Sequence, residues 1–399
     1  MTSNGNSSRI PPPKSGSTDA YNILALDGGG VKGISSVIIL DKIMNRIRDL
    51  ENQANTEKGK PTDVRDRKPV DYFDLAAGTS TGGLIALMLF RLEMNCPDVI
   101  AQYENLAKEV FKPMLGKIPL NSLGSFGKWI GDIWLKLKAV VGRSQFSHQP
   151  LEKAIDAVVG AFPLDDDDRA RKGDAVLVKS SQGQMFMCAT LADRGESVLL
   201  RNYDPPFAPL PVSTGARALD FNAITIKEAA RATSAAPTYL KEATIQNLKF
   251  WDGGLLNNNP IVQAWDNRFD LVSRDAPSPQ ITCIVSLGTT HPEYDANKRP
   301  GSGIMRFFNT ITKTVAFVTN TEAKHRDFDR NMRQRNERNP TRRTSYYRFN
   351  ASTGKDEIDL DDYLKMPKLR EYTDIYLEKP EIAQWVNQCA ALLAKTTSL

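Results

Sequence analysis

The stretch of the chain that most restricts its fold runs from Asp71 to Phe90 and reads DYFDLAAGTSTGGLIALMLF. A short apolar segment leads into a G-x-S-x-G turn, and a segment of helix-forming composition follows it. This order predicts a strand, a sharp turn and a helix. The turn would hold Ser80 in strained backbone angles at a helix N-terminus, where amide groups favour developing negative charge. Ser80 is therefore the candidate nucleophile, although small-residue turns of this kind also occur for packing reasons.

A second turn is rich in glycine and reads DGGGVKG over residues 27–33. It lies between a predicted buried strand, residues 21–26, and a predicted helix that starts at residue 34. Successive amide groups in such a turn point outward without side chains to cover them. The turn is therefore a natural cradle for an anion.

Two other interpretations of this turn are excluded by its surroundings. It matches G-x-G-x-x-G, but the polar residues 51–60 stand where a dinucleotide site requires a second strand that ends in an acidic residue. A P-loop would need Gly-Lys-Ser/Thr, whereas here Lys32 precedes Gly33. The remaining interpretation is an oxyanion hole that serves Ser80.

A third turn contains an aspartate followed by two glycines. Asp252 ends a predicted strand, residues 248–251, and the sequence Asn-Asn-Asn-Pro at 257–260 then starts another helix. An aspartate in this position can reach into a cleft without steric cover from its neighbours. Asp252 is therefore a candidate partner for the serine.

A serine nucleophile needs a base, and the chain offers two arrangements. The three histidines are His148, His291 and His325. A serine, an aspartate and either of the last two histidines would match the chain order of an α/β-hydrolase triad. The placement of the glycine turns suits a two-residue site better, in which Asp252 takes the Ser80 proton directly. A free carboxylate is a weak base, so this arrangement requires burial that raises its pKa and a serine within hydrogen-bond reach.

Four motifs in this order resemble the patatin-like phospholipase family. They are DGGGVKG at 27–33, GTSTGG at 78–83, ATSAAPTY at 232–239 and DGG at 252–254. The resemblance covers most of residues 21–290 and implies a three-layer α/β/α fold with a mostly parallel central sheet. It also implies a Ser–Asp dyad that hydrolyses fatty acyl esters of phospholipids or neutral lipids, without a metal or organic cofactor.

The resemblance assigns roles residue by residue. It implies that Ser80 is the nucleophile and that Asp252 is its partner. The amides of Gly28, Gly29 and Gly30 would form the oxyanion hole. The glycines that would support these turns are Gly33, Gly78, Gly82, Gly253 and Gly254.

Two features depart from the family pattern. Lys32 stands where arginine is frequent, and the segment 111–146 has no counterpart, which leaves the substrate open. Within this segment Trp129 and Trp134 recur with other apolar residues at helical spacing. The basic residues among or beside them are Lys128, Lys136, Lys138 and Arg143. Such a segment suits a lid or a peripheral contact with a membrane. A helix packed on the body with solvated lysines fits the pattern equally well, so both interpretations stay open.

The composition predicts an ordinary soluble globular chain, since 41% of the 399 residues are apolar and 25% are charged. We expect a disordered tail at 1–20, a catalytic domain at 21–290 with the lid-like insertion, and a helical C-terminal extension at 291–399 packed on the same domain. Four separated cysteines and an N-terminus without an apolar core indicate a reducing compartment and no signal peptide. The expected location is cytoplasmic, with at most peripheral contact with membranes.

Two charged stretches are expected to carry no site. Residues 324–343 are rich in lysine and arginine, but acidic residues interrupt them and no aromatic stacking platform accompanies them. We therefore expect a solvated helix face and no nucleic-acid partner. Residues 165–168 are all aspartate but lack the alternating ligands of a calcium loop, so we expect a solvated turn.

The leading expectation for function is a lipid acyl hydrolase of the phospholipase A or lysophospholipase type. An acyltransferase on the same scaffold would pass the acyl group to an alcohol or a lysolipid instead of water. A lipid-binding protein with an inactive site is the third alternative. The presence of every expected site residue argues against it.

Overall fold

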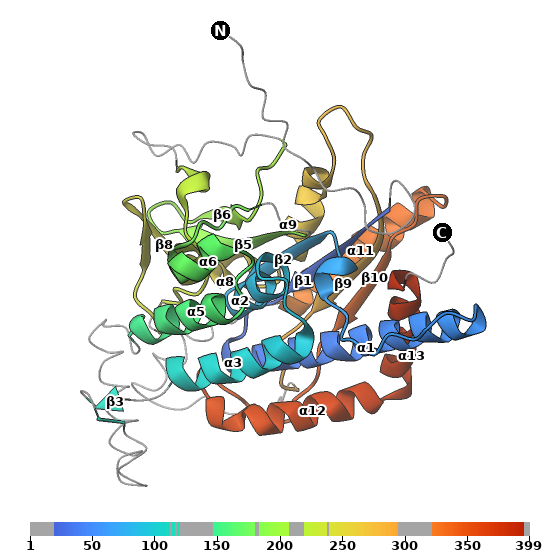
Figure 1. The fold of residues 1–399 in the computed structure, drawn as a ribbon, viewed down its shortest axis with the longest axis horizontal. Coiled ribbons are helices and arrows are strands. Elements are labelled where there is room, and N and C mark those ends of the chain that lie inside the picture. Colours follow the sequence, from blue (N-terminus) through green and yellow to red (C-terminus); the bar gives the residue numbers. More distant parts are fainter. Residues whose placement is uncertain are drawn as a thin grey trace.

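The computed structural model describes residues 20–111, 114–115, 118–119, 147–179, 183–206, 219–237, 239–293 and 321–394. The strands are β1 (Ala20–Leu26), β2 (Leu75–Thr79), β3 (Met114–Leu115), β4 (Ile118–Pro119), β5 (Gln184–Leu191), β6 (Glu196–Arg201), β7 (Ala243–Ile245), β8 (Leu248–Asp252), β9 (Gln280–Leu287) and β10 (Ser345–Phe349). The central sheet has the order β10–β9–β1–β2–β5–β8–β7, with β6 also paired to β5 (Figure 1). The strands from β10 to β5 pair in parallel, whereas β6, β7 and β8 pair antiparallel.

The helices follow the strands along most of the chain. The α-helices are α1 (Gly33–Glu57), α2 (Thr81–Ala86), α3 (Cys96–Val110), α5 (Gln149–Ala161), α6 (Asp166–Arg171), α7 (Ile226–Thr233), α8 (Gly254–Asn257), α9 (Ile261–Asp266), α11 (Thr321–Arg338), α12 (Met366–Glu378) and α13 (Pro380–Leu393). A π-helical turn, Leu87–Arg91, continues α2. Short 3₁₀ turns lie at Gly30–Lys32, Pro69–Asp71, Lys172–Asp174, Phe221–Ala223, Asn267–Leu271 and Tyr363–Lys365.

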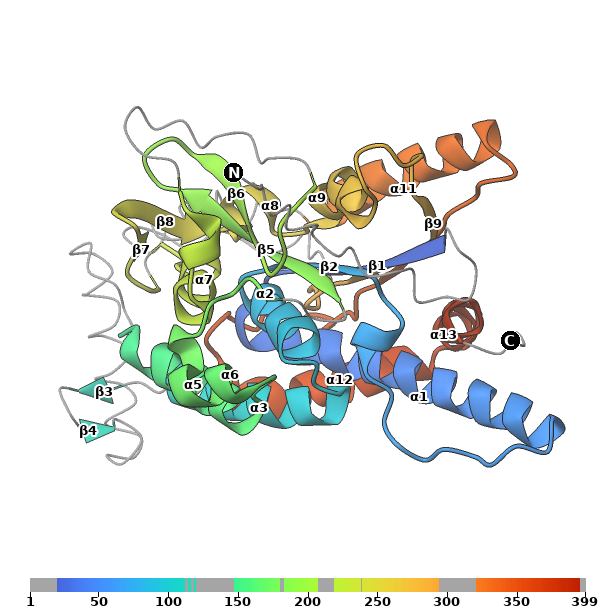
Figure 2. The same cartoon turned by 45° about the horizontal axis from the view of Figure 1, so that its top comes forward.

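Helices cover both faces of the sheet, because alternate residues of each strand point to opposite sides. In β1, Leu24 and Leu26 lie in a core with α1, α3, α5, α12 and α13. Ile23 and Ala25 lie in a second core with α9 and α11. Figure 2 shows the sheet between these two helix layers. The predicted α/β fold with a mostly parallel central sheet flanked by helices is confirmed.

The three predicted turns meet because their strands are neighbours in the sheet. β1 and β2 run in parallel, with Leu26 opposite Gly78. β5 lies on the other side of β2, and its Ala189 is opposite Asp252 of β8. The carboxyl ends of parallel strands form one edge of a sheet, where ligand sites of α/β proteins occur. The glycine-rich turn and the Ser80 turn therefore gather at this edge. The DGG turn joins them because β8, which runs antiparallel, ends beside the carboxyl end of β5.

The described part of the predicted C-terminal extension supplies a strand as well as helices. β10 extends the sheet in parallel beside β9. α12 and α13 pack on α1 and on each other, on the first face of the sheet. Residues near the end of the chain therefore share a core with residues near its beginning, while the division of the chain at residue 290 stays a prediction.

Some of the sequence predictions concern residues outside the described ranges. These residues are 1–19 of the predicted tail and nearly all of the predicted insertion 111–146, including Trp129 and Trp134. Their expected roles stay predictions. Within the described ranges, no helix combines the length and the apolar composition that crossing a membrane requires.

The aspartates at 165–168 do not form a solvated turn throughout, so that prediction is wrong. Asp165 accepts a hydrogen bond from the Asp168 amide and thereby caps α6. The Asp168 side chain is fully buried and accepts two hydrogen bonds of 2.8 Å from Arg91. Lys179 adds a contact at 2.9 Å. A helix cap and a buried ion pair account for the two ends of this run.

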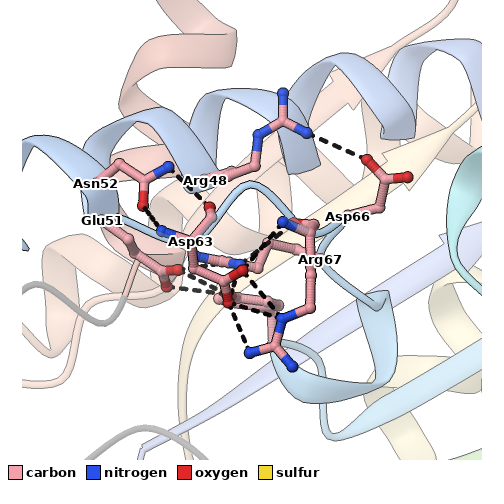
Figure 3. A network of polar contacts seen from close by, with 8 residues as sticks. Arg48, Glu51, Asn52, Asp63, Asp66 and Arg67 are labelled. Atoms are coloured by element: carbon pink, nitrogen blue, oxygen red, sulfur yellow. Dashed lines mark hydrogen bonds and ion pairs between the residues drawn. The ribbon is translucent and has the colours of Figure 1, made fainter. Parts of the chain in front are cut away.

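The loop between α1 and β2 is tied back to α1 by polar contacts (Figure 3). The Asn52 side chain donates to the Asp63 carbonyl at 2.9 Å and accepts from the Asp63 amide at 2.8 Å. Arg67 pairs with Glu51 at 2.8 Å and with Asp63 at 3.0 Å. These contacts fix the path of the chain into β2, the strand that leads to Ser80.

Candidate active site

Ser80 occupies a sharp turn between β2 and α2. Its backbone angles are φ 53° and ψ −124°, a strained conformation expected of a serine at such a turn. The glycines around Ser80 lie so close to other backbone atoms that a side chain at their own positions would clash. A Cβ on Gly78 would lie 2.3 Å from the Gly82 carbonyl oxygen, and one on Gly82 would lie 2.3 Å from the Leu26 carbonyl oxygen. The glycine-rich turn also lies against Ser80, since a Cβ on Gly28 would lie 3.2 Å from the Ser80 Cβ.

The C-terminal end of α7 packs against the Ser80 turn. The Thr233 hydroxyl accepts a hydrogen bond from the Ser80 amide at 2.9 Å and donates to the Cys188 carbonyl of β5 at 2.7 Å. One side chain thus joins the turn to a neighbouring strand. Thr233 lies in the ATSAAPTY motif, and its contact with the Ser80 turn spans 153 positions.

Asp252, at the end of β8, lies close enough to Ser80 for the serine side chain to lower the pKa of its carboxyl group. Its side chain is buried, and its carboxylate accepts a hydrogen bond from the Gly254 amide at 2.6 Å. Burial raises the pKa of Asp252 to about 6, and the hydrogen bonds from the Ser80 side chain and the Gly254 amide lower it only in part. Among the described residues no lysine or arginine pairs with this carboxylate. A carboxylate with a raised pKa beside a serine hydroxyl can accept its proton.

Gly253 allows the DGG turn to pass close to β5, because a Cβ here would lie 2.2 Å from the Cys188 carbonyl oxygen. We expect Gly253→Ala to lower the free energy of unfolding by about 1–3 kcal/mol through overpacking. Gly160→Ala in α5 is the matched control, since the nearest atom to its Cβ would lie 3.7 Å away. That variant should be as stable as the wild type or more so. Chemical denaturation checks both, and equal stability of the two variants would contradict the prediction.

The three amides predicted to form an oxyanion hole differ in their hydrogen bonds. The Gly28 amide donates to the Asn258 carbonyl at 3.0 Å, so it is already engaged. The Gly29 amide donates to a side chain, the Thr81 hydroxyl, at 3.2 Å. For the Gly30 amide, the described part of the chain offers no acceptor. The oxyanion hole stays a prediction, and of its three amides that of Gly28 is the one engaged by a backbone carbonyl.

The peptide bond between Gly30 and Val31 is held from both sides. Gly30 has a φ of +57°, a conformation that favours glycine. The Tyr103 hydroxyl of α3 donates to its carbonyl, and the Val31 amide donates to the Leu360 carbonyl at 2.8 Å. Gly33 leaves room for Tyr103, because a Cβ there would lie 2.4 Å from the tyrosine oxygen. These contacts, which the sequence did not indicate, set the orientation of the turn.

None of the three histidines is hydrogen-bonded to the serine or to the carboxylate beside it. His325 Nδ1 lies 3.0 Å from the Tyr346 hydroxyl, and His148 lies 3.9 Å from Glu152. His291 Nδ1 is buried without a hydrogen-bond partner among the described residues. The geometry therefore favours the two-residue arrangement over the triad.

Comparison with known proteins identifies the family of the chain. A model of the patatin-like phospholipase family matches residues 24–265. The chain belongs to the patatin-like phospholipase family. The family membership predicted from the four sequence motifs is thereby confirmed. The match ends before β9, so α11, β10, α12 and α13 lie outside it.

Curated relatives share limited identity with this chain. Phospholipase A I of Arabidopsis thaliana is 26% identical over 314 residues, which are 69% of this chain and 21% of that protein. Patatin-like phospholipase 1 of Plasmodium falciparum is 25% identical over 375 residues, 89% of this chain and 47% of that protein. A cGAMP-activated phospholipase of Vibrio cholerae is 27% identical over 295 residues, 71% and 68% of the two chains. The chain spans less than half the length of the first two relatives.

Proposed function

We propose that this chain is a lipid acyl hydrolase of the phospholipase A or lysophospholipase type, acting through an acyl-serine intermediate. The observation that carries the proposal is that Ser80 and the buried Asp252 carboxylate lie together beside the glycine-rich turn. The family and the phospholipase names of the relatives support a lipid ester as the substrate. Phospholipids and neutral lipids both fit the proposal.

In the proposed first step, the Ser80 hydroxyl adds to the ester carbonyl carbon while Asp252 accepts its proton. The carbonyl oxygen becomes an oxyanion, which the amides of Gly29 and Gly30 stabilise. The alcohol then leaves with the proton from Asp252, and the acyl chain stays on Ser80 as an ester. In the second step Asp252 takes a proton from water, whose oxygen adds to the acyl carbon. The fatty acid leaves as Ser80 regains its proton.

The reaction is expected to depend on pH through Asp252. Because burial raises its pKa to about 6, the carboxylate is protonated and cannot act as a base in more acidic solution. The value of kcat/KM should therefore rise with pH and reach half its maximum near pH 6, since this ratio reports the free enzyme. A carboxylate with an ordinary pKa would place this point at about pH 4. Initial rates of fatty acid release across the pH range measure the profile.

A second buried carboxylate, that of Asp27, titrates in the same range, since burial raises its pKa to about 6 while Arg348 opposes the shift. The profile is therefore repeated with Asp27→Asn, in which the acid limb should remain. Disappearance of the limb in this variant, or full activity of the wild type at pH 5, would contradict the assignment to Asp252.

The reaction class is tested with phospholipid vesicles and triacylglycerol emulsions labelled in the acyl chain, with and without a lysolipid acceptor. We expect labelled free fatty acid from at least one substrate under both conditions. Transfer to the acceptor without release of fatty acid would make the protein an acyltransferase. No product from a correctly folded protein would leave the inactive lipid-binding alternative.

A further inference from the structure

Asp27, the first residue of the glycine-rich turn, is buried and held by an arginine from a distant strand. Its two carboxylate oxygens accept hydrogen bonds from Arg348 of β10 at 3.0 Å and 2.7 Å. β9 lies between β10 and β1, and there the arginine also donates to the Ser286 hydroxyl at 3.0 Å. A contact with two parallel hydrogen bonds fixes the angle of the carboxylate as well as its distance.

Arg348 is itself held by a second carboxylate. Glu322 of α11 accepts hydrogen bonds from Arg348 Nη2 at 2.7 Å and from Nε at 3.2 Å. The Asn350 side chain donates to the same glutamate oxygen at 2.8 Å. One guanidinium group therefore joins the glycine-rich turn, β10 and α11. Its removal would leave two acidic groups without their shared cation.

Other contacts on the turn also come from residues beyond 265, where the family match ends. The Asp27 amide donates to the Leu287 carbonyl at 3.0 Å. The Thr289 hydroxyl donates to the Gly28 carbonyl at 2.9 Å, and the Leu360 carbonyl accepts from the turn as described above. The orientation of the turn thus depends on the C-terminal part of the chain.

We propose that Arg348 is a positioning residue for the oxyanion hole, because its contact with Asp27 sets the direction of the amides that follow. This inference rests on the proposed hydrolase function. Losing one oxyanion donor costs an enzyme about 10²- to 10³-fold in kcat. A tilt of the turn would therefore slow turnover without weakening lipid binding. The segment 321–394 then contributes to the rate as well as to stability.

A buried ion pair can also serve stability alone, and the chain contains a matched case. Arg91 and Asp168 form a fully buried pair with two contacts of 2.8 Å. The other acceptors of Arg91 are the carbonyls of residues 176 and 177, not the glycine-rich turn. Disrupting either pair should lower stability, but only the pair at the turn should affect the rate.

The test compares Arg348→Lys with Arg91→Lys in the full chain. Lysine keeps the positive charge of arginine but cannot form the bidentate contact with a carboxylate. The measurements are kcat and KM for a soluble short-chain ester and the midpoint of chemical unfolding. We expect a lower midpoint in both variants. Only Arg348→Lys should lose kcat, by about 10²-fold, with KM unchanged. Unchanged kcat in Arg348→Lys, or an equal loss in Arg91→Lys, would overturn the proposal.

Glu322→Gln is a milder variant for the case in which Arg348→Lys does not fold, since it keeps the arginine and weakens one of its contacts. A fall in kcat of about fivefold would support the proposal, and an unchanged kcat would overturn it.

If the wild type hydrolyses no ester, the proposed function fails, and positioning is tested by hydrogen exchange of the amides in residues 27–33. Faster exchange in Arg348→Lys, or in Glu322→Gln where the lysine variant does not fold, than in Arg91→Lys would support the positioning role. Equal exchange would overturn it.

Discussion

Asp252→Asn is expected to lower kcat for ester hydrolysis by about 10³-fold, because an amide cannot accept the Ser80 proton. The asparagine has nearly the same shape, and its oxygen can still accept the hydrogen bond from the Gly254 amide. The loss should therefore appear in kcat rather than in the fold. Initial rates of fatty acid release from phospholipid vesicles measure it, with circular dichroism as a check on folding.

The histidines provide the matched controls for this variant. His291→Gln and His325→Gln should keep the wild-type rate, since neither side chain is hydrogen-bonded to Ser80 or Asp252. A large loss of activity in one of these variants, with Asp252→Asn still active, would favour a triad.

Asp252→Asn should also change stability in a pH-dependent direction. The folded-state pKa of Asp252 is about 6, whereas an unfolded chain has a value of about 3.9. The folded state therefore binds more protons between these values, and stability falls as the pH rises through them. Asparagine carries no such cost. The melting temperature of Asp252→Asn relative to wild type should be higher at about pH 8 than at about pH 4.

Ser80→Ala is expected to lower hydrolysis by about 10⁴-fold or more, because no acyl-serine can form. The variant should also lose covalent labelling by a fluorophosphonate probe, which mass spectrometry would locate at residue 80 in the wild type. Alanine keeps the Cβ, so the packing against Gly28 should be preserved.

The exposed Ser273 supplies the control for this second prediction. Ser273→Ala should keep both the rate and the labelling of the wild type. Equal hydrolysis by wild type and Ser80→Ala would remove the catalytic role of the serine. Labelling of Ser80→Ala at another residue would place the nucleophile elsewhere.

The turns of the site could be predicted from the sequence because their causes act over a few residues. Gly78 and Gly82 leave room that a strand–turn–helix around Ser80 needs, as the close approach of the Leu26 carbonyl shows. The resemblance of the four motifs to a known family implied the α/β fold with a mostly parallel sheet. The four motifs together predicted the family, which the comparison confirmed.

The contacts that hold the glycine-rich turn could not be predicted, because they come from residues far away in the sequence. Arg348 and Asp27 are 321 positions apart, and neither residue belongs to a pattern that indicates the other. The sequence also treats the three glycines of the predicted hole alike. Only the packing of the Asn258 carbonyl and the Thr81 hydroxyl against the turn distinguishes the engaged Gly28 and Gly29 amides from that of Gly30.

By itself, then, the sequence determined which residues can form tight turns, which segments are strands and helices, and the family of the chain. Tertiary structure alone decided that the Asp252 carboxylate is buried enough to raise its pKa, and that Arg348 of β10 holds the glycine-rich turn. The physical reason is that steric limits on a turn are local. Burial, distance and pKa arise only when strands remote in sequence are aligned side by side in one sheet.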